Sequence, residues 1–202
     1  MRKKSHISLA KHLVTVAEVQ SFNRHRKAFY IGSILPDCKP SFITRRHEIT
    51  ETFPFVEHKI QKLTHGYHAI GDLSTAYFTR LGEVIHYIAD YFTFPHNKEY
   101  PGTIKEHCVY EGQLKHRLRS YIQAVHEQES LTGESLMLSA GSLRQFENVS
   151  DICSFIREEH RKYIKKAVHS VEEDCKYIVK ICSQVVMAIL HVCISSMEYK
   201  YL

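Results

Sequence analysis

The sequence is poor in the features that define several protein classes. Its 202 residues include only eight glycines and five prolines, which excludes collagen-like and low-complexity chains. Hydrophobic residues make up 44% and charged residues 24%, the composition of a folded soluble domain. The six cysteines form no C-x-x-C pair, so neither a zinc ribbon nor a thioredoxin-type motif is present. We expect one domain over residues 1–202, large enough to fold without a disulfide or a structural metal.

Long uninterrupted hydrophobic runs are also missing. The basic start MRKKSHISLAKHLVTVA resembles a signal peptide, but His6, Lys11 and His12 break its apolar stretch, so no cleavable signal is predicted. The most apolar segment, residues 177–194, contains a lysine, a glutamine and a histidine and is shorter than the roughly 20 residues of a membrane span. We therefore expect a core helix, no transmembrane segment, reduced thiols and a cytoplasmic location.

Helical periodicity dominates the chain, and alternation typical of strands is scarce. It predicts helices over residues 7–19, 52–63, 72–92, 104–125, 151–168 and 171–197. Asp72 fits the N-cap of the third of these helices. Gly32, Pro36 and Pro40 predict a loop over residues 32–46, and a polar stretch predicts a loop or mobile insertion over residues 129–142. The expected fold is all-α, a single-domain multi-helix bundle.

Histidine is more abundant than in most soluble proteins, with 15 residues beside 22 aspartates and glutamates. The net charge of +5 and the pI near 8.8 favour an anionic partner such as a phosphate ester, a nucleic acid or a lipid headgroup surface, without choosing among them.

Three of the histidines are grouped with two acids. His86 and Asp90 are four residues apart on a predicted helix and project from one face, and His107 and Glu111 repeat this spacing on the next helix. His96 lies between the pairs in the turn FTFPHN. One such pair alone is usually a solvated ion pair. Two pairs joined by a histidine, in otherwise apolar helices, predict a zinc site, and the carboxylates favour a catalytic one.

The pattern H-Y-x-x-D-x-x-x-x-P-H, followed eleven residues later by H-x-x-x-E, resembles the zinc-dependent phospholipase C family. The all-α fold of that family also includes the S1/P1-type nucleases. The resemblance implies a zinc cluster at one end of the bundle, formed within residues 1–111. It implies that Asp90 is a carboxylate shared by two zinc ions. His86, Asp37 and His47 would bind one of these two ions together with Asp90. His96, His107 and Glu111 would hold another ion.

The N-terminus departs from the family pattern. Secreted members bind zinc through the amine and carbonyl of an N-terminal tryptophan, helped by a histidine in the first helix, and this chain has no tryptophan. His6 is the best match to that histidine and His12 is the alternative. Whether the amine of Met1 takes part is left open, so two or three zinc ions are expected.

The ligand set predicts a hydrolase. Two zinc ions that share a carboxylate lower the pKa of a bridging water toward neutrality, which gives a hydroxide able to attack phosphorus. Asp37 would orient or deprotonate this water as well as bind metal. The expected substrate is a phosphate ester, and the resemblance makes a phospholipid headgroup bond the leading case.

Two alternatives remain. One is a nuclease or nucleotidase on the same fold, which needs an aromatic pocket for base stacking. The sequence locates no such pocket, so no stable nucleic-acid partner is expected. The other is a non-catalytic helical protein that keeps a zinc site to brace the bundle.

Overall fold

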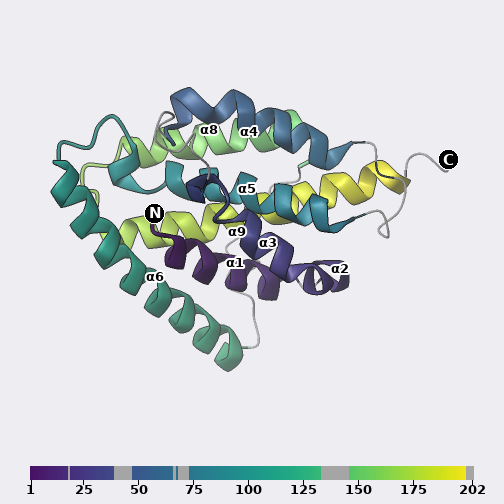
Figure 1. Ribbon diagram of the computed structural model, residues 1–202, viewed down its shortest axis with the longest axis horizontal. Coiled ribbons are helices and arrows are strands. Elements are labelled where there is room, and N and C mark those ends of the chain that lie inside the picture. The colour runs from purple at the N-terminus through teal and green to yellow at the C-terminus, as the bar shows by residue number, and fades with distance from the viewer. Residues whose placement is uncertain (18, 39–46, 66, 68–72, 133–145, 199–202) are drawn as a thin grey trace.

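The computed structural model describes residues 1–17, 19–38, 47–65, 67, 73–132 and 146–198. These residues form eight α-helices, two short 3₁₀ helices and no strand (Figure 1), which confirms the all-α prediction. The elements in chain order are α1 (Lys3–Ala17), α2 (Gln20–Arg24), α3 (Arg26–Gly32), η1 (Pro36–Cys38), α4 (Ile49–Thr64), α5 (Thr75–Tyr91), η4 (Phe94–His96), α6 (Ile104–Thr132), α8 (Val149–Ile164) and α9 (Val171–Glu198).

Helix α9 is the centre of the bundle. It contacts α1, α4, α5, α6 and α8, and Figure 1 shows it passing through the middle of the molecule with α6 crossing one end. Its segment Val171–Ser196 is long and apolar enough to cross a membrane by length and composition, and 67% of its most apolar window is buried inside the molecule. That burial is the arrangement expected of a core helix.

Helix α5 is buried on nearly every side and packs closely against α3. A Cβ atom on Gly82 would lie 2.4 Å from the carbonyl oxygen of Phe29, and one on Gly32 would lie 2.1 Å from that of Thr79. Real Cβ atoms do not approach backbone this closely, so the two helices can touch only because both positions are glycine. This contact brings the residue after α3, Ser33, against α5.

The structure corrects several predicted boundaries. Helix α5 begins at Thr75, with Ser74 as its N-cap and the Ser74 hydroxyl accepting from the Tyr77 N–H, while Asp72 lies outside the described residues. Helix α1 begins at Lys3 rather than residue 7, because Ser5 and His6 are also buried.

The segment between α1 and η1 contains two helices that periodicity did not predict. α2 and α3 are short, and they are held by Phe22 and Phe29, whose buried rings lie edge to face with centroids 4.7 Å apart. The predicted loop 32–46 includes η1, and its residues 39–46 lie outside the described part of the chain.

The segment predicted as a loop over residues 129–142 is helical at its start. Helix α6 continues through Thr132, so residues 129–132 belong to it. Residues 133–142 lie outside the described part of the chain. Helix α8 begins at Val149 because Asn148 and Asp151 form a capping box there.

Candidate metal centre

Helix α5 carries His86 and Asp90 into the interior of the bundle. Neither side chain is exposed at all, and His86 Nε2 lies 3.3 Å from Asp90 Oδ2, one turn further along the helix. Leu81, Val84 and Ile88 on the same helix are buried as well, so this part of α5 lies inside the core. A buried charge is costly unless it is paired, so this carboxylate requires partners from other elements.

Two distant segments supply such partners. Asp37 in η1 places its Oδ1 atom 3.5 Å from His86 Nε2. His47, just before α4, places its Nδ1 atom 2.8 Å from Asp90 Oδ2 and 3.1 Å from His86 Nε2. The donor atoms of all four residues lie within 4.8 Å of one another. We call Asp37, His47, His86 and Asp90 the first group.

The orientation of the His86 ring is set by the backbone of α3's C-terminal end. His86 Nδ1 lies 2.8 Å from the carbonyl oxygen of Ser33. A carbonyl only accepts, so Nδ1 carries a hydrogen and donates it to Ser33, and Nε2 is the ring nitrogen that faces Asp37 and Asp90. A hydrogen bond of this kind is the usual way in which a metal-binding histidine is held.

A second group forms where η4 meets α6. His96 Nε2 and His107 Nε2 lie 3.1 and 3.2 Å from the same oxygen, Glu111 Oε1. Thr103 and Glu106 form a capping box at the start of α6, which fixes the helical turn that carries His107. The His107 side chain is 31% exposed, so this group is more open than the first.

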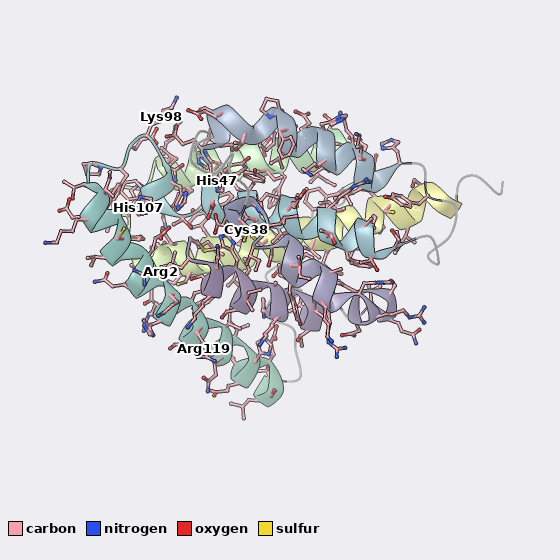
Figure 2. All side chains as sticks on the ribbon, viewed as in Figure 1. Arg2, Cys38, His47, Lys98, His107 and Arg119 are labelled. Atoms are coloured by element: carbon pink, nitrogen blue, oxygen red, sulfur yellow. The ribbon has the colours of Figure 1, made fainter. Side chains whose placement is uncertain are left out.

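Asp90 of the first group and the nitrogen of Met1 connect the two groups. Asp90 Oδ2 is 3.8 Å from His96 Nδ1. The Met1 nitrogen lies 2.6 Å from Asp90 Oδ1, 2.9 Å from His96 Nε2 and 3.2 Å from Glu111 Oε1. His6 adds its Nε2 atom 3.4 Å from Asp90 Oδ1. Figure 2 labels His47 and His107, which lie on the side of the molecule where Figure 1, in the same view, marks the N-terminus.

His6, and not His12, reaches this centre. The His6 ring is 1% exposed and stacks on the His86 ring, with centroids 4.0 Å apart, and its Nε2 atom has no hydrogen-bond partner. His12, two turns further along α1, instead places Nδ1 2.7 Å from His126 Nε2 on α6.

Three groups at the centre, His6, Asp90 and Glu111, have protonation states that bind metal. Burial and the neighbouring His86 lower the pKa of His6 to about 3, so its ring is neutral. Burial alone would raise the pKa of Asp90, but the Met1 amine and the surrounding imidazoles hold it well below its usual value. Burial likewise opposes ionisation of Glu111, and hydrogen bonds from His107 and His96 lower its pKa. Ionised carboxylates and neutral imidazoles are the forms that coordinate a cation.

Comparison with known families shows to which family the chain belongs. Residues 5–170 match the family described as zinc dependent phospholipase C. The chain belongs to the zinc dependent phospholipase C family. This confirms the resemblance read from the spacing of His86, Asp90 and His96. No curated protein and no solved structure matches the chain significantly.

The residues of this phospholipase C family chain fit zinc. His86 Nε2 lies 3.5 Å from Asp37 Oδ1 and 3.3 Å from Asp90 Oδ2, so two carboxylates approach the same imidazole nitrogen. The buried His6 Nε2 has no partner and also points at a carboxylate oxygen. Carboxylates gathered this closely repel each other unless a cation lies among them, and imidazole with carboxylate is a ligand set that suits zinc.

Two cavities open beside the centre. The first has a volume of about 580 Å³ and is lined by Asp37, His47, His96, His107 and Glu111, among others. The second has a volume of about 530 Å³, shares Met1, Asp37 and Glu111 with the first, and is lined by four cationic residues, Arg2, Lys3, Lys4 and Lys115. None of these four forms an ion pair with a residue that the structure describes. Figure 2 labels Arg2 close to His107.

All eight residues predicted from the sequence meet at this centre: His6, Asp37, His47, His86, Asp90, His96, His107 and Glu111. Sequence reasoning missed the Ser33 carbonyl because a backbone group leaves no trace in residue identity. It also left the Met1 nitrogen open, since nothing in the residue pattern near the start of the chain points toward Asp90. The pair Thr103 and Glu106 did carry a signal, because T-x-x-E ahead of a helix is a capping-box pattern.

Proposed function

We propose that this protein is a zinc-dependent phosphodiesterase of the phospholipase C type that hydrolyses an anionic phosphate ester. The observation that carries the proposal is the position of Asp90, whose carboxylate contacts members of both metal groups beside a cavity of about 580 Å³. A cavity of this size accommodates a phosphate headgroup.

The chain's own residues divide into metal-binding and substrate-facing sets. Asp37, His47, His86 and Asp90 would hold one zinc ion, and His96, His107 and Glu111 another, with His6 and the Met1 nitrogen beside Asp90 as the set for a third. Zinc bound there supplies a Lewis acid and an activated water. Asp37 lines both cavities, so its carboxylate can accept a hydrogen bond from water and orient it toward phosphorus.

The cations of the second cavity favour a substrate with more than one negative charge. Arg2 is held in place because it donates a hydrogen bond to the Cys108 carbonyl at 2.8 Å and lies over Gly112. Lys3, Lys4 and Lys115 lie around the same opening. Cationic side chains that are free of ion pairs attract and orient phosphate groups.

The central test measures zinc content and hydrolysis together in protein tagged at its C-terminus, so that the Met1 nitrogen is unchanged. We expect at least two zinc ions per chain and hydrolysis of phospholipid vesicles. His107→Ala should lose one zinc ion and most activity, whereas His116→Ala, an exposed histidine on the same helix, should change neither. Fewer than two zinc ions in the wild type would contradict the two-metal centre. Cleavage of single-stranded nucleic acid alone would favour the nuclease, and zinc without hydrolysis would favour the bracing role.

Substrate charge is tested with a pair of lysines on α1. Lys4→Glu should lower kcat/KM for an anionic phospholipid by about threefold to tenfold, an effect on the order of 1 kcal/mol. It should change the value for phosphatidylcholine less. Lys11→Glu makes the same charge change on the same helix outside the cavity and should leave both values unchanged. Equal effects of the two variants would refute this assignment of the second cavity.

A further inference from the structure

A buried carboxylate outside both metal groups joins the elements that carry the second one. Asp174 lies in the first turn of α9, and none of its surface is exposed. Its Oδ2 atom accepts hydrogen bonds from the Phe94 backbone N–H and from the Tyr110 hydroxyl, each at 2.9 Å. Its Oδ1 atom accepts from the Tyr163 hydroxyl at 2.7 Å.

The two donors to Oδ2 lie next to the second metal group. Phe94 begins η4, two residues before His96. Tyr110 precedes Glu111 on α6 and follows His107 by nearly one turn. One carboxylate oxygen therefore ties the turn that carries His96 to the helix that carries His107 and Glu111. The residue after η4 is held as well, because His160 Nε2 donates to Asn97 Oδ1 at 2.8 Å.

We propose that Asp174 is a positioning residue for the second metal group, because it sets the distance between His96 on η4 and His107 with Glu111 on α6. The proposal rests on the zinc function proposed above. Groups that hold metal ligands in position are part of a metal site, and their loss costs about 10–100-fold in metal affinity. Burial raises the pKa of Asp174 to about 6, so at neutral pH the carboxylate is ionised and can accept from all three donors.

This contribution comes from a part of the chain that the family comparison does not cover. The match ends at residue 170, and Asp174 follows in α9. Apart from Met1, the residues that would bind zinc belong to the matched part. Asp174, whose carboxylate sets the spacing of three of them, lies beyond it. Helix α9 therefore contributes to the geometry of the centre as well as to the packing of the bundle.

The two oxygens of Asp174 provide a matched pair of variants. Tyr110→Phe removes a hydroxyl that links α6 to Oδ2, and Tyr163→Phe removes one that links α8 to Oδ1. Helix α8 carries no member of either metal group. Tyr163 is fully buried and Tyr110 is not, so a purely structural role predicts the larger loss of melting temperature and of zinc affinity for Tyr163→Phe.

The experiment titrates each purified protein with zinc against a competing chelator, and His107→Ala identifies the binding step that belongs to the second group. We expect Tyr110→Phe and Asp174→Asn to weaken that step by about tenfold or more and to leave the other step unchanged. In cobalt-substituted protein, the visible absorption of the second group should change in Tyr110→Phe and not in Tyr163→Phe.

Two results would overturn the proposal. One is a zinc affinity of the second group that stays within about twofold of the wild type in Tyr110→Phe, and the other is an equal loss in Tyr110→Phe and Tyr163→Phe. If Asp174→Asn does not fold, the comparison of Tyr110→Phe with Tyr163→Phe still tests the proposal. A wild-type protein that binds no zinc overturns both this proposal and the proposed function, whereas normal zinc binding with unaffected variants overturns only this one.

Discussion

The close contact between α3 and α5 makes a quantitative prediction about Gly82. In Gly82→Ala the new Cβ atom would lie 2.4 Å from the Phe29 carbonyl oxygen and 2.7 Å from the Ser33 nitrogen, where ordinary contacts begin near 3.4 Å. These obstacles are backbone atoms, so α3 must move by about 1 Å. Overpacking of this kind costs about 1–3 kcal/mol. The Ser33 carbonyl, which holds His86 Nδ1 at 2.8 Å, moves with it.

Gly112 provides the matched control. It is also inside a long helix, but the nearest atoms to an added Cβ belong to the Arg2 guanidinium, at 3.3 Å, which is the flexible end of a side chain. Both substitutions gain about 1 kcal/mol of helix propensity. We therefore expect Gly112→Ala to raise the free energy of unfolding by up to about 1 kcal/mol and Gly82→Ala to lower it.

Thermal unfolding followed by circular dichroism measures this difference. For a chain of this length, 1 kcal/mol corresponds to a change of about 2–4 °C in Tm. Gly82→Ala should also weaken zinc binding at the first group, because the carbonyl that orients His86 is displaced. A Gly82→Ala protein as stable as Gly112→Ala would show that the contact is not tight, and the account of how Ser33 reaches His86 would fail with it.

Two further predictions concern pH and metal. His160 is buried and donates to Asn97, and burial lowers its pKa from 6.5 to about 4, so its stabilising effect is complete above pH 6.5 and is lost as the pH falls toward 4. Urea unfolding should show the wild type losing up to about 3 kcal/mol more than His160→Gln over that interval, and a pH-independent gap between the two proteins would refute this. Saturating zinc at about 1,000 times its dissociation constant should stabilise the wild type by about 4 kcal/mol over chelator-treated protein. In Tm measurements, Asp90→Asn should lose most of this stabilisation. An equal stabilisation of Asp90→Asn by zinc would exclude Asp90 as a ligand.

The local parts of the fold and of the site were predictable from sequence. His86, Asp90 and His96 lie within one stretch, and helix geometry alone puts the first two on one face. The start of α5 was misplaced because Asp72 and Ser74 are both good N-cap residues, and local sequence does not rank them.

The long-range contacts could not be predicted from the sequence. Nothing distinguishes Asp174 from Glu172 and Glu173 beside it, since all three are acids in the first turn of α9. Its role follows only from the approach of Phe94 and Tyr110, which are 80 and 64 residues away. Helices α2 and α3 were missed because each is too short for a periodic pattern, and tertiary contacts between their phenylalanines hold them.

The central position of α9 has a consequence for the order in which the molecule can assemble. On the ribosome, residues 1–170 emerge first and include every side chain of the two metal groups. The helices α1, α4, α5, α6 and α8 all pack on α9, so they have no completed core until it follows. Burying this last helix requires contacts across most of the chain, a topology that slows folding. A nascent chain stalled before α9 would expose the apolar faces of five helices, and it would be a substrate for chaperones even though its zinc-binding side chains had already been made.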